Sequence, residues 1–266
     1  MTEKTINGVI FLEFELFKDS NWFKHCFSTR IGGVSKGHSA SLNFRAKDES
    51  RENLTENYKR ICAAASLSFD GLTFSYQEHG ANIRTITASD RGKGLHKKRD
   101  YSNIDGLITN EPNICLTTFY ADCTPVFLAD PVTQAVGLIH AGWRSTYLEI
   151  AKRAVEEMVR EYNTNPENIL AGIGPSICCS CFEVDKPVYD KFAAYTNYIA
   201  PKNQTADKYI IDLKGINSQM LIDAGLKESN IEISPLCTKC NDRLFYSHRR
   251  DGDNRGSMAA FMEINI

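Results

Sequence analysis

Two histidines and one cysteine stand where metal-binding side chains could converge. His79, Cys123 and His140 each lie in a turn or at the edge of a β-rich run, so side chains from different strands could meet at one point. Two neutral imidazoles and one thiolate suit a catalytic zinc ion, which keeps a fourth position open for a water molecule of lowered pKa. Because the three residues are too far apart for a compact zinc finger, their spacing alone does not establish the site.

The same residues also fit a different chemistry. Cys123 with His140 and Asp122 has the ingredients of a cysteine hydrolase, in which a histidine activates a thiolate nucleophile. One thiolate cannot easily serve as both metal ligand and nucleophile. A metal bound at Cys123 in the resting protein would therefore exclude the nucleophile hypothesis.

Four further cysteines form two Cys-x-x-Cys pairs, Cys178/Cys181 and Cys237/Cys240. Together they have the composition of a structural four-cysteine zinc site. The pairs are about 55 residues apart, whereas zinc ribbons usually have about 15–20. Two interpretations stay open, a structural zinc site and buried thiols that pack two loops together.

The elements that must position these residues alternate irregularly along the chain. Strands are expected at Val9–Phe17, Trp22–Thr29, Thr73–Gln77, Ile83–Thr87, Ile114–Tyr120, Val126–Leu128, Ala135–Ile139, Ile231–Ser234 and Met258–Ile266, and helices at Arg51–Ala65, Ser145–Glu161, Val184–Phe192 and Asp212–Ala224. This order predicts an α/β fold with a mixed sheet layered with helices. No linker, repeat or low-complexity tract divides the sequence, so a single domain over residues 1–266 is expected.

Composition narrows the class of partner. The 31 basic and 33 acidic residues nearly cancel, so no strong field favours nucleic acid or an anionic membrane. The sequence shows neither a signal-peptide pattern nor a run of about 18 apolar residues, and we expect a cytoplasmic protein with small-molecule partners. In a reducing compartment, nine cysteines are expected to be free thiols or metal ligands. The oligomeric state is left open.

Five short motifs surround the candidate ligands. They are Gln77-Glu78-His79-Gly80, Ala121-Asp122-Cys123-Thr124-Pro125, His140-Ala141-Gly142-Trp143-Arg144, Gly174-Pro175-Ser176-Ile177 and Tyr246-Ser247-His248-Arg249-Arg250-Asp251-Gly252. Together they resemble the laccase-domain family, long labelled polyphenol oxidase and more recently purine nucleoside phosphorylase. The likeness runs from about Phe27 to the C-terminus, with the motifs in the family's order. The last motif usually has Tyr where His248 stands, and Thr124 replaces an aliphatic residue.

The resemblance implies an α/β/α sandwich-like fold and a zinc ion held by His79, Cys123 and His140, with copper as the other metal named for the family. It implies phosphorolysis of adenosine, inosine, guanosine and methylthioadenosine, with adenosine deamination as a second activity. Purine nucleosides and phosphate are thus the expected partners. His248, in the place of that Tyr, is a candidate for a fourth ligand or an acid.

Several polar residues are candidates for binding substrate. Arginines suit phosphate because a guanidinium donates two parallel hydrogen bonds, and Asn43 could bind a ribose hydroxyl or the edge of a base. The arginine candidates are Arg30, Arg144, Arg249 and Arg250. Glu78 and Asp122 are the carboxylates nearest the ligands, and either could transfer protons in deamination or orient a ligand.

Other activities remain as alternatives. A peptidoglycan-precursor amidase, proposed for relatives, is the main catalytic one, and a copper-dependent phenol oxidase is another. Six histidines are too few for the several copper centres of true laccases. A non-enzymatic metal or redox sensor predicts reversible thiol oxidation without turnover.

Overall fold

The computed structural model describes residues 1–47, 49–202 and 208–265, and its strands within these ranges form two six-stranded sheets and one three-stranded sheet. The first sheet has the order β1 (Thr2–Ile6), β2 (Val9–Glu13), β3 (Phe23–Ser28), β15 (Met258–Ile264), β7 (Cys115–Tyr120) and β4 (Leu72–Phe74). The second has the order β14 (Ile231–Ile233), β10 (Leu170–Ile173), β8 (Thr124–Asp130), β9 (Ala135–Ala141), β6 (Gly106–Thr109) and β5 (Ile83–Thr85). Each contains parallel and antiparallel pairs, so both sheets are mixed.

The two sheets pack face to face, and alternating side chains of β8 show how. Phe127 faces the first sheet and joins a core that includes Leu116 and Met262. Its neighbours Val126 and Leu128 point to the opposite face, as the two-residue period of a strand requires. Strands buried on both faces read as continuous apolar runs, which explains the sequence of β8 and β9.

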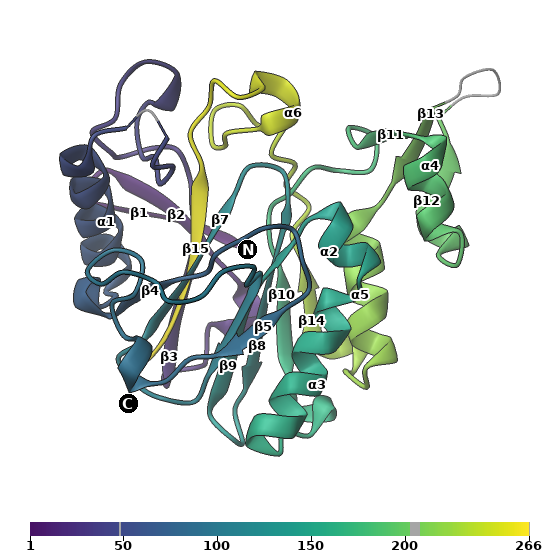
Figure 1. The fold of residues 1–266 in the computed structure, drawn as a ribbon, viewed down its shortest axis with the longest axis horizontal. Helices are drawn as coiled ribbons and strands as arrows, with labels where there is room; N and C mark the ends of the chain where they lie inside the picture. The colour runs from purple at the N-terminus through teal and green to yellow at the C-terminus, as the bar shows by residue number, and fades with distance from the viewer. Residues whose placement is uncertain (48, 203–207, 266) are drawn as a thin grey trace.

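Helices cover the two outer faces (Figure 1). α1 (Arg51–Ala65) packs on the first sheet, and α3 (Ile150–Tyr162) and α5 (Leu213–Asp223) pack on the second. The short helices are α2 (Trp143–Tyr147), α4 (Lys186–Tyr189) and α6 (His248–Asp251). The predicted α/β class with mixed strands and helical layers is confirmed, and the middle of the sandwich consists of two sheets.

The bounds of α1 match the sequence prediction because both ends carry clear signals. The Ser50 side chain accepts a hydrogen bond from the Asn53 N–H, and Ser66 ends the helix in the left-handed region. The expected helix Ser145–Glu161 is instead two helices, α2 and α3. Glu149 lies between them with a φ of 61°, which is incompatible with a continuous α-helix.

The segment expected as a helix at Val184–Phe192 starts as a strand. β11 (Glu183–Asp185) pairs with β13 (Lys208–Ile211), which also pairs with β12 (Ile199–Pro201), and α4 follows directly. Pro187 lies in the first turn of α4, where its missing N–H costs nothing. This small sheet projects at one corner of the molecule (Figure 1).

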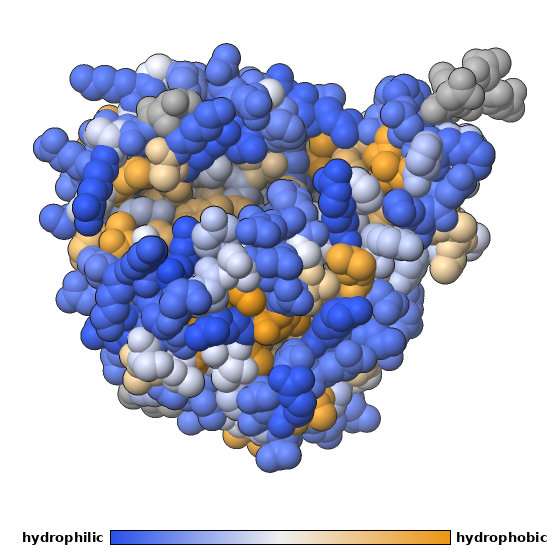
Figure 2. Space-filling model, viewed as in Figure 1, coloured by the Kyte–Doolittle hydropathy of each residue, from blue (hydrophilic) through white to orange (hydrophobic). Residues whose placement is uncertain are grey.

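The face of the molecule in Figure 2 is mostly hydrophilic, and its hydrophobic groups are seen chiefly in recesses between polar ones. None of the helices in the described ranges combines the length and apolar character that crossing a membrane demands.

A buried histidine gives the fold a pH dependence that can be measured. His25 on β3 is 8% exposed, and its Nε2 accepts a hydrogen bond from the Phe14 N–H at 2.9 Å. Burial lowers the pKa of His25 to about 3. In the unfolded chain, His25 is protonated below a pH of about 6.5, whereas in the folded protein it stays neutral down to a pH of about 3. The contribution of His25 to the free energy of unfolding is therefore complete above a pH of about 6.5 and falls by up to about 1.4 kcal/mol per pH unit toward pH 3.

Between pH 7 and pH 5, we therefore expect the free energy of unfolding to fall by about 2 kcal/mol less in His25→Gln than in the wild type. Urea unfolding of both proteins at the two pH values measures this difference, and contributions from other groups cancel in the comparison. Equal losses in both proteins would show that His25 is not held neutral.

Candidate metal centre

The predicted ligands meet at one end of the second sheet. β5 and β6 are parallel and both start at this end, and β8 also starts there, whereas the antiparallel β9 ends there. His79 precedes β5, Cys123 precedes β8 and His140 lies near the end of β9. The topology thus brings together three residues that are far apart in sequence.

Asp105 shapes the turn that carries His79. This buried carboxylate precedes β6, and its oxygens accept hydrogen bonds from the N–H groups of Glu78, His79 and Gly80 at 3.1, 3.0 and 2.9 Å. Three bonds to consecutive backbone groups hold His79 in the left-handed region, with a φ of 61°. That conformation is uncommon for residues other than glycine, so Asp105 stabilises a strained turn.

Asp105 also orients His140. Its Oδ1 lies 2.8 Å from the Nδ1 of His140, and its carbonyl oxygen accepts from the His140 N–H at 2.8 Å. With Nδ1 donating to the carboxylate, Nε2 is the nitrogen that can bind a metal. Burial raises the pKa of Asp105, but the hydrogen bond and charge of His140 outweigh it and lower that pKa overall.

Cys123 is held by an anchored loop. The preceding residue, Asp122, has a φ of 87°, and its carboxylate accepts from Thr238 Oγ1 at 2.6 Å, Ser247 Oγ at 3.0 Å and the Arg249 N–H at 2.7 Å. The loop before β8 is thereby tied to two C-terminal segments. Asp122 positions Cys123, while its oxygens are engaged away from proton transfer.

The three candidate ligand atoms lie within 4.8 Å of one another, and Cys123 Sγ is 3.9 Å from His79 Nε2. Burial raises the pKa of the Cys123 thiol, but the charge of His140 and hydrogen bonds to both histidines lower it to about 6. Burial opposes protonation of His140, yet the Cys123 thiolate and Asp105 raise its pKa to about 9. The site thus favours the thiolate, which is the form that binds metal.

The cluster opens into a cleft of about 360 Å³. His79 is exposed and Cys123 is half-buried, and both line this cleft, whereas His140 is buried behind them. The lining residues are His79, Ala121, Asp122, Cys123, Trp143, Arg144, Ile177, Phe182, Leu213, His248 and Arg249. Of these, Trp143, Phe182, Ile177 and Leu213 supply apolar surface.

Only some of the predicted substrate-binding residues line this cleft. Arg144 is exposed and lies over the Trp143 ring, with its Cζ 4.3 Å from the ring centroid. Arg249 also lines the cleft, and its Nη1 donates to the carbonyl oxygens of Cys181 and Glu183 at 3.2 and 3.0 Å. These are the two arginines that the structure brings to the candidate ligands.

The other three predicted substrate-binding residues, Arg30, Asn43 and Arg250, do not line the cleft and instead bond to loops around it. Arg30 donates to the Ala40 carbonyl at 3.0 Å, and Asn43 is buried and bonds to Arg45 and Ser257. Arg250 donates to the carbonyls of Thr238, Lys239 and Phe245 and pairs with Asp251. These contacts fasten the loops around the site, and substrate binding by these three residues stays a prediction.

Two further residues predicted for the site, Glu78 and His248, lie close to the candidate ligands. Glu78 is exposed beside His79, and His248 lines the cleft, where its Nδ1 lies 3.2 Å from the Gly252 carbonyl. His248 is not one of the three clustered ligands among the described residues. Asp105 and Phe182 also belong to the site but were not predicted, because Asp105 stands outside the five motifs and Phe182 follows the cysteine-rich segment.

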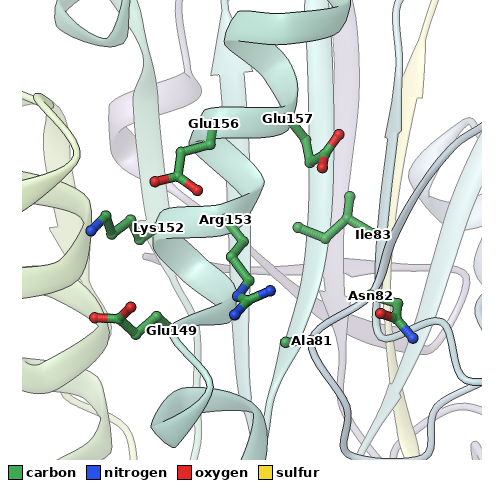
Figure 3. A pocket seen from close by; sticks show the side chains of 8 residues that line it. All are labelled: Ala81, Asn82, Ile83, Glu149, Lys152, Arg153, Glu156 and Glu157. Atoms are coloured by element: carbon green, nitrogen blue, oxygen red, sulfur yellow. The ribbon is translucent and has the colours of Figure 1, made fainter.

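Figure 3 shows another hollow, of about 420 Å³, between β5 and α3. Its walls include the charged residues Glu149, Lys152, Arg153, Glu156 and Glu157, which are exposed or partly exposed. Charges of both signs on one helix are typical of a solvated face. Neither group of potential metal ligands in the described chain lies there.

The site leaves no room for a side chain at Gly142. A Cβ there would lie 2.9 Å from His79 Cδ2 and 3.1 Å from Cys123 Sγ. We expect Gly142→Ala to displace one of these side chains and weaken metal binding, measured with zinc as the probe, by about 10-fold or more, since overpacking usually costs about 1–3 kcal/mol. Competition with a chromogenic chelator measures the affinity.

Ser145→Ala is the matched control for that substitution. Ser145 lies in α2, and its buried hydroxyl has no hydrogen-bond partner within the described part of the chain. Its affinity for zinc should equal that of the wild type. Unchanged affinity in Gly142→Ala would mean that the ligands can rearrange around the added methyl group.

Comparison with known proteins places the chain in a family. A family model described as multi-copper polyphenol oxidoreductase laccase matches residues 24–265. Purine nucleoside phosphorylase YlmD of Bacillus subtilis is 37% identical over 243 residues, which cover 89% of this chain and 86% of that protein.

Two solved structures are also similar. They are Bacillus licheniformis hypothetical protein YfiH, with a TM-score of 0.89, 32% identity and coverage of 98% of this chain and 97% of that one, and YlmD from Geobacillus stearothermophilus, with a TM-score of 0.87, 32% identity and coverage of 99% and 98%. The chain therefore belongs to the laccase-like polyphenol oxidoreductase family, as its motifs indicate.

Proposed function

We propose that this chain is a zinc-dependent purine nucleoside phosphorylase that acts on adenosine, inosine, guanosine and methylthioadenosine and also deaminates adenosine. One observation carries the proposal. A cluster of two histidines and a cysteine opens into a cleft that presents both aromatic rings and arginines, in a chain 37% identical to a Bacillus subtilis purine nucleoside phosphorylase.

The donor set fits a zinc ion. His140 is held with Nδ1 on Asp105, which directs Nε2 to the site, and Cys123 has a lowered pKa. Two imidazoles and a thiolate leave a further coordination position open, as catalytic zinc sites do, and the same donors also accept copper. When bound, the metal supplies a Lewis acid at the wall of the cleft.

The cleft can hold a purine nucleoside. Trp143 and Phe182 offer aromatic faces for the base, and Ile177 and Leu213 extend the apolar surface. A volume of about 360 Å³ lies within the range of about 300–1,000 Å³ found for small-molecule pockets. Aromatic stacking tolerates different purines, which supports a broad substrate range.

The arginines supply what phosphorolysis needs. An oxygen of hydrogen phosphate forms a bond to C1′ of the ribose while the bond from C1′ to the base nitrogen breaks. The electron pair of that bond stays on the base, which takes the phosphate proton, so the products are ribose 1-phosphate and the free purine. Arg144 and Arg249 can bind the phosphate oxygens and hold them against C1′.

Deamination is a separate hydrolysis, in which an oxygen from water bonds to C6 of the purine while the C6–N bond breaks and ammonia leaves. It needs a carboxyl group that moves a proton from the water to the departing amino group. Asp122 is committed to Thr238, Ser247 and the Arg249 backbone. Glu78 is exposed next to His79, and we propose its carboxylate for this transfer. Phenol oxidation is disfavoured because true laccases bind several copper ions through many histidines, and the cluster contains two of this chain's six.

Chromatography of the zinc-loaded protein with adenosine, with and without phosphate, tests the proposal. Adenine and ribose 1-phosphate that form only with phosphate are the expected products, and inosine that forms without phosphate reports deamination. If neither adenine nor inosine appears, the phosphorylase proposal is wrong. Release of amino acids from peptidoglycan precursors by the same preparation would then identify an amidase.

A further inference from the structure

The two Cys-x-x-Cys pairs come together at the same end of the second sheet as the metal centre. β10 and β14 are parallel neighbours, so the segments that follow them leave the sheet side by side. The pairing continues past the strands, where the Thr238 N–H donates to the Ser176 carbonyl at 3.1 Å. Cys178/Cys181 follow β10 and Cys237/Cys240 follow β14, so the gap of about 55 residues is closed by topology.

Each pair lies in a tight turn. The N–H groups of Cys181 and Phe182 donate to the Cys178 carbonyl at 3.0 and 2.9 Å, and the Asn241 N–H donates to the Cys237 carbonyl at 3.1 Å. In such a turn, two cysteines that are three positions apart in the sequence have their thiols on the same side of the turn. The sulfur atoms of all four cysteines lie within 4.8 Å of one another, and Cys181 Sγ is 3.4 Å from Cys240 Sγ.

We propose that Cys178, Cys181, Cys237 and Cys240 bind a second, structural zinc ion. The ligand number and type are those of a closed tetrathiolate site, which has no position left for substrate. In such a site, zinc–sulfur bonds of about 2.3 Å place the sulfur atoms about 3.8 Å apart, so only small movements would close the cluster around an ion. This inference does not depend on the proposed enzymatic activity.

The surroundings suit a tetrathiolate. Four thiolates and one zinc ion carry a net charge of about −2, which favours a nearby cation. The ammonium group of Lys214 is buried, donates to the carbonyls of Ser234 and Leu236 just before Cys237, and interacts electrostatically with Cys237 and Cys178. The Cys178 N–H also donates to Cys237 Sγ at 3.3 Å. Hydrogen bonds from the backbone to ligand sulfur stabilise the thiolate form.

A metal here would brace the substrate cleft. Arg249 lines the cleft and donates to the Cys181 carbonyl, and Arg250 donates to the carbonyls of Thr238 and Lys239, inside the second cysteine turn. Thr238 in turn donates to Asp122, which precedes the ligand Cys123. The second zinc would therefore fix the frame that holds Arg249 and Cys123 in place.

Metal analysis by mass spectrometry after purification under reducing conditions tests the inference. We expect about two zinc ions per wild-type chain and about one in Cys240→Ser, because serine is a poor zinc ligand. Cys240 is exposed, so this substitution is compatible with folding. Cys179→Ser is the matched control, since Cys179 is an exposed thiol in the same loop but outside the four, and it should keep both ions.

Cobalt substitution gives an independent result if Cys240→Ser does not fold. In Cys123→Ala, one cobalt ion with the strong sulfur-to-cobalt charge-transfer absorption of a tetrathiolate should remain. A wild-type chain with one zinc ion and no tetrathiolate cobalt spectrum would overturn the proposal. So would equal zinc contents in the wild type and Cys240→Ser.

Discussion

Cys123→Ala should lower the rate of phosphate-dependent adenine release by at least about 10³-fold, well beyond the ~10–100-fold that loss of an outer partner of a metal ligand costs. The substitution removes the single thiolate of the site and leaves two imidazoles, one of them on the exposed His79. Initial rates from chromatography and zinc content per chain are the two measurements. Both should fall together, with zinc reduced by one ion.

The zinc content separates the two roles considered for Cys123. If the thiolate were only a nucleophile, activity would vanish while the metal stayed bound. If activity persisted without the metal, the centre would have no part in the reaction. Cys179→Ser serves as the control because it removes an exposed thiol outside both clusters, and it should keep both activity and metal.

Elements with clear local sequence signals were predicted well, and elements without such signals were missed. α1 has a capping serine and α5 has an Asp212 cap, and both were predicted to within about one residue. β6 and β10 were missed because each is a four-residue strand that contains a glycine, which is too short a run to show a strand pattern. The break at Glu149 was missed because no glycine or proline signals it.

Some features of the site could be predicted from sequence motifs, and others required the contacts in the structure. Motifs pointed to His79, Cys123 and His140 as metal ligands, and the structure shows that the sheet brings their side chains together. The same motifs pointed to Arg250, although its guanidinium fastens the Cys237–Cys240 turn and does not line the cleft. Motif position reports that a residue matters to the site, but contacts are needed to tell binding from bracing.

Convergence of distant segments was the hardest feature to predict. The gap between the cysteine pairs argued against one metal site when measured along the chain. The parallel pairing of β10 with β14 removes that objection, because parallel strands end at the same edge. Asp105 escaped notice for a related reason, since its role follows from the register that sets Gly106 opposite Ile139 and hence Asp105 beside His140.

Asp105→Asn should weaken zinc binding at the proposed catalytic centre and lower turnover by about 10–100-fold, as expected for a residue that orients metal ligands. The carboxylate accepts hydrogen bonds from His140 Nδ1 and from the N–H groups of Glu78, His79 and Gly80. An asparagine amide is nearly the same size, but its NH₂ group must face N–H donors on one side. Both the His79 turn and the His140 tautomer should lose their support.

Chelator competition in a Cys240→Ser background would isolate the affinity of this centre, and nitrogen NMR of the histidine rings would report the His140 tautomer directly. Asp90→Asn is the matched control, because Asp90 is a buried carboxylate that bonds to Arg84 and Lys93. It should lose stability and keep its metal affinity. If Asp105→Asn also lost only stability, with His140 still protonated on Nδ1, then the backbone of β9 and not the carboxylate would orient the ligand.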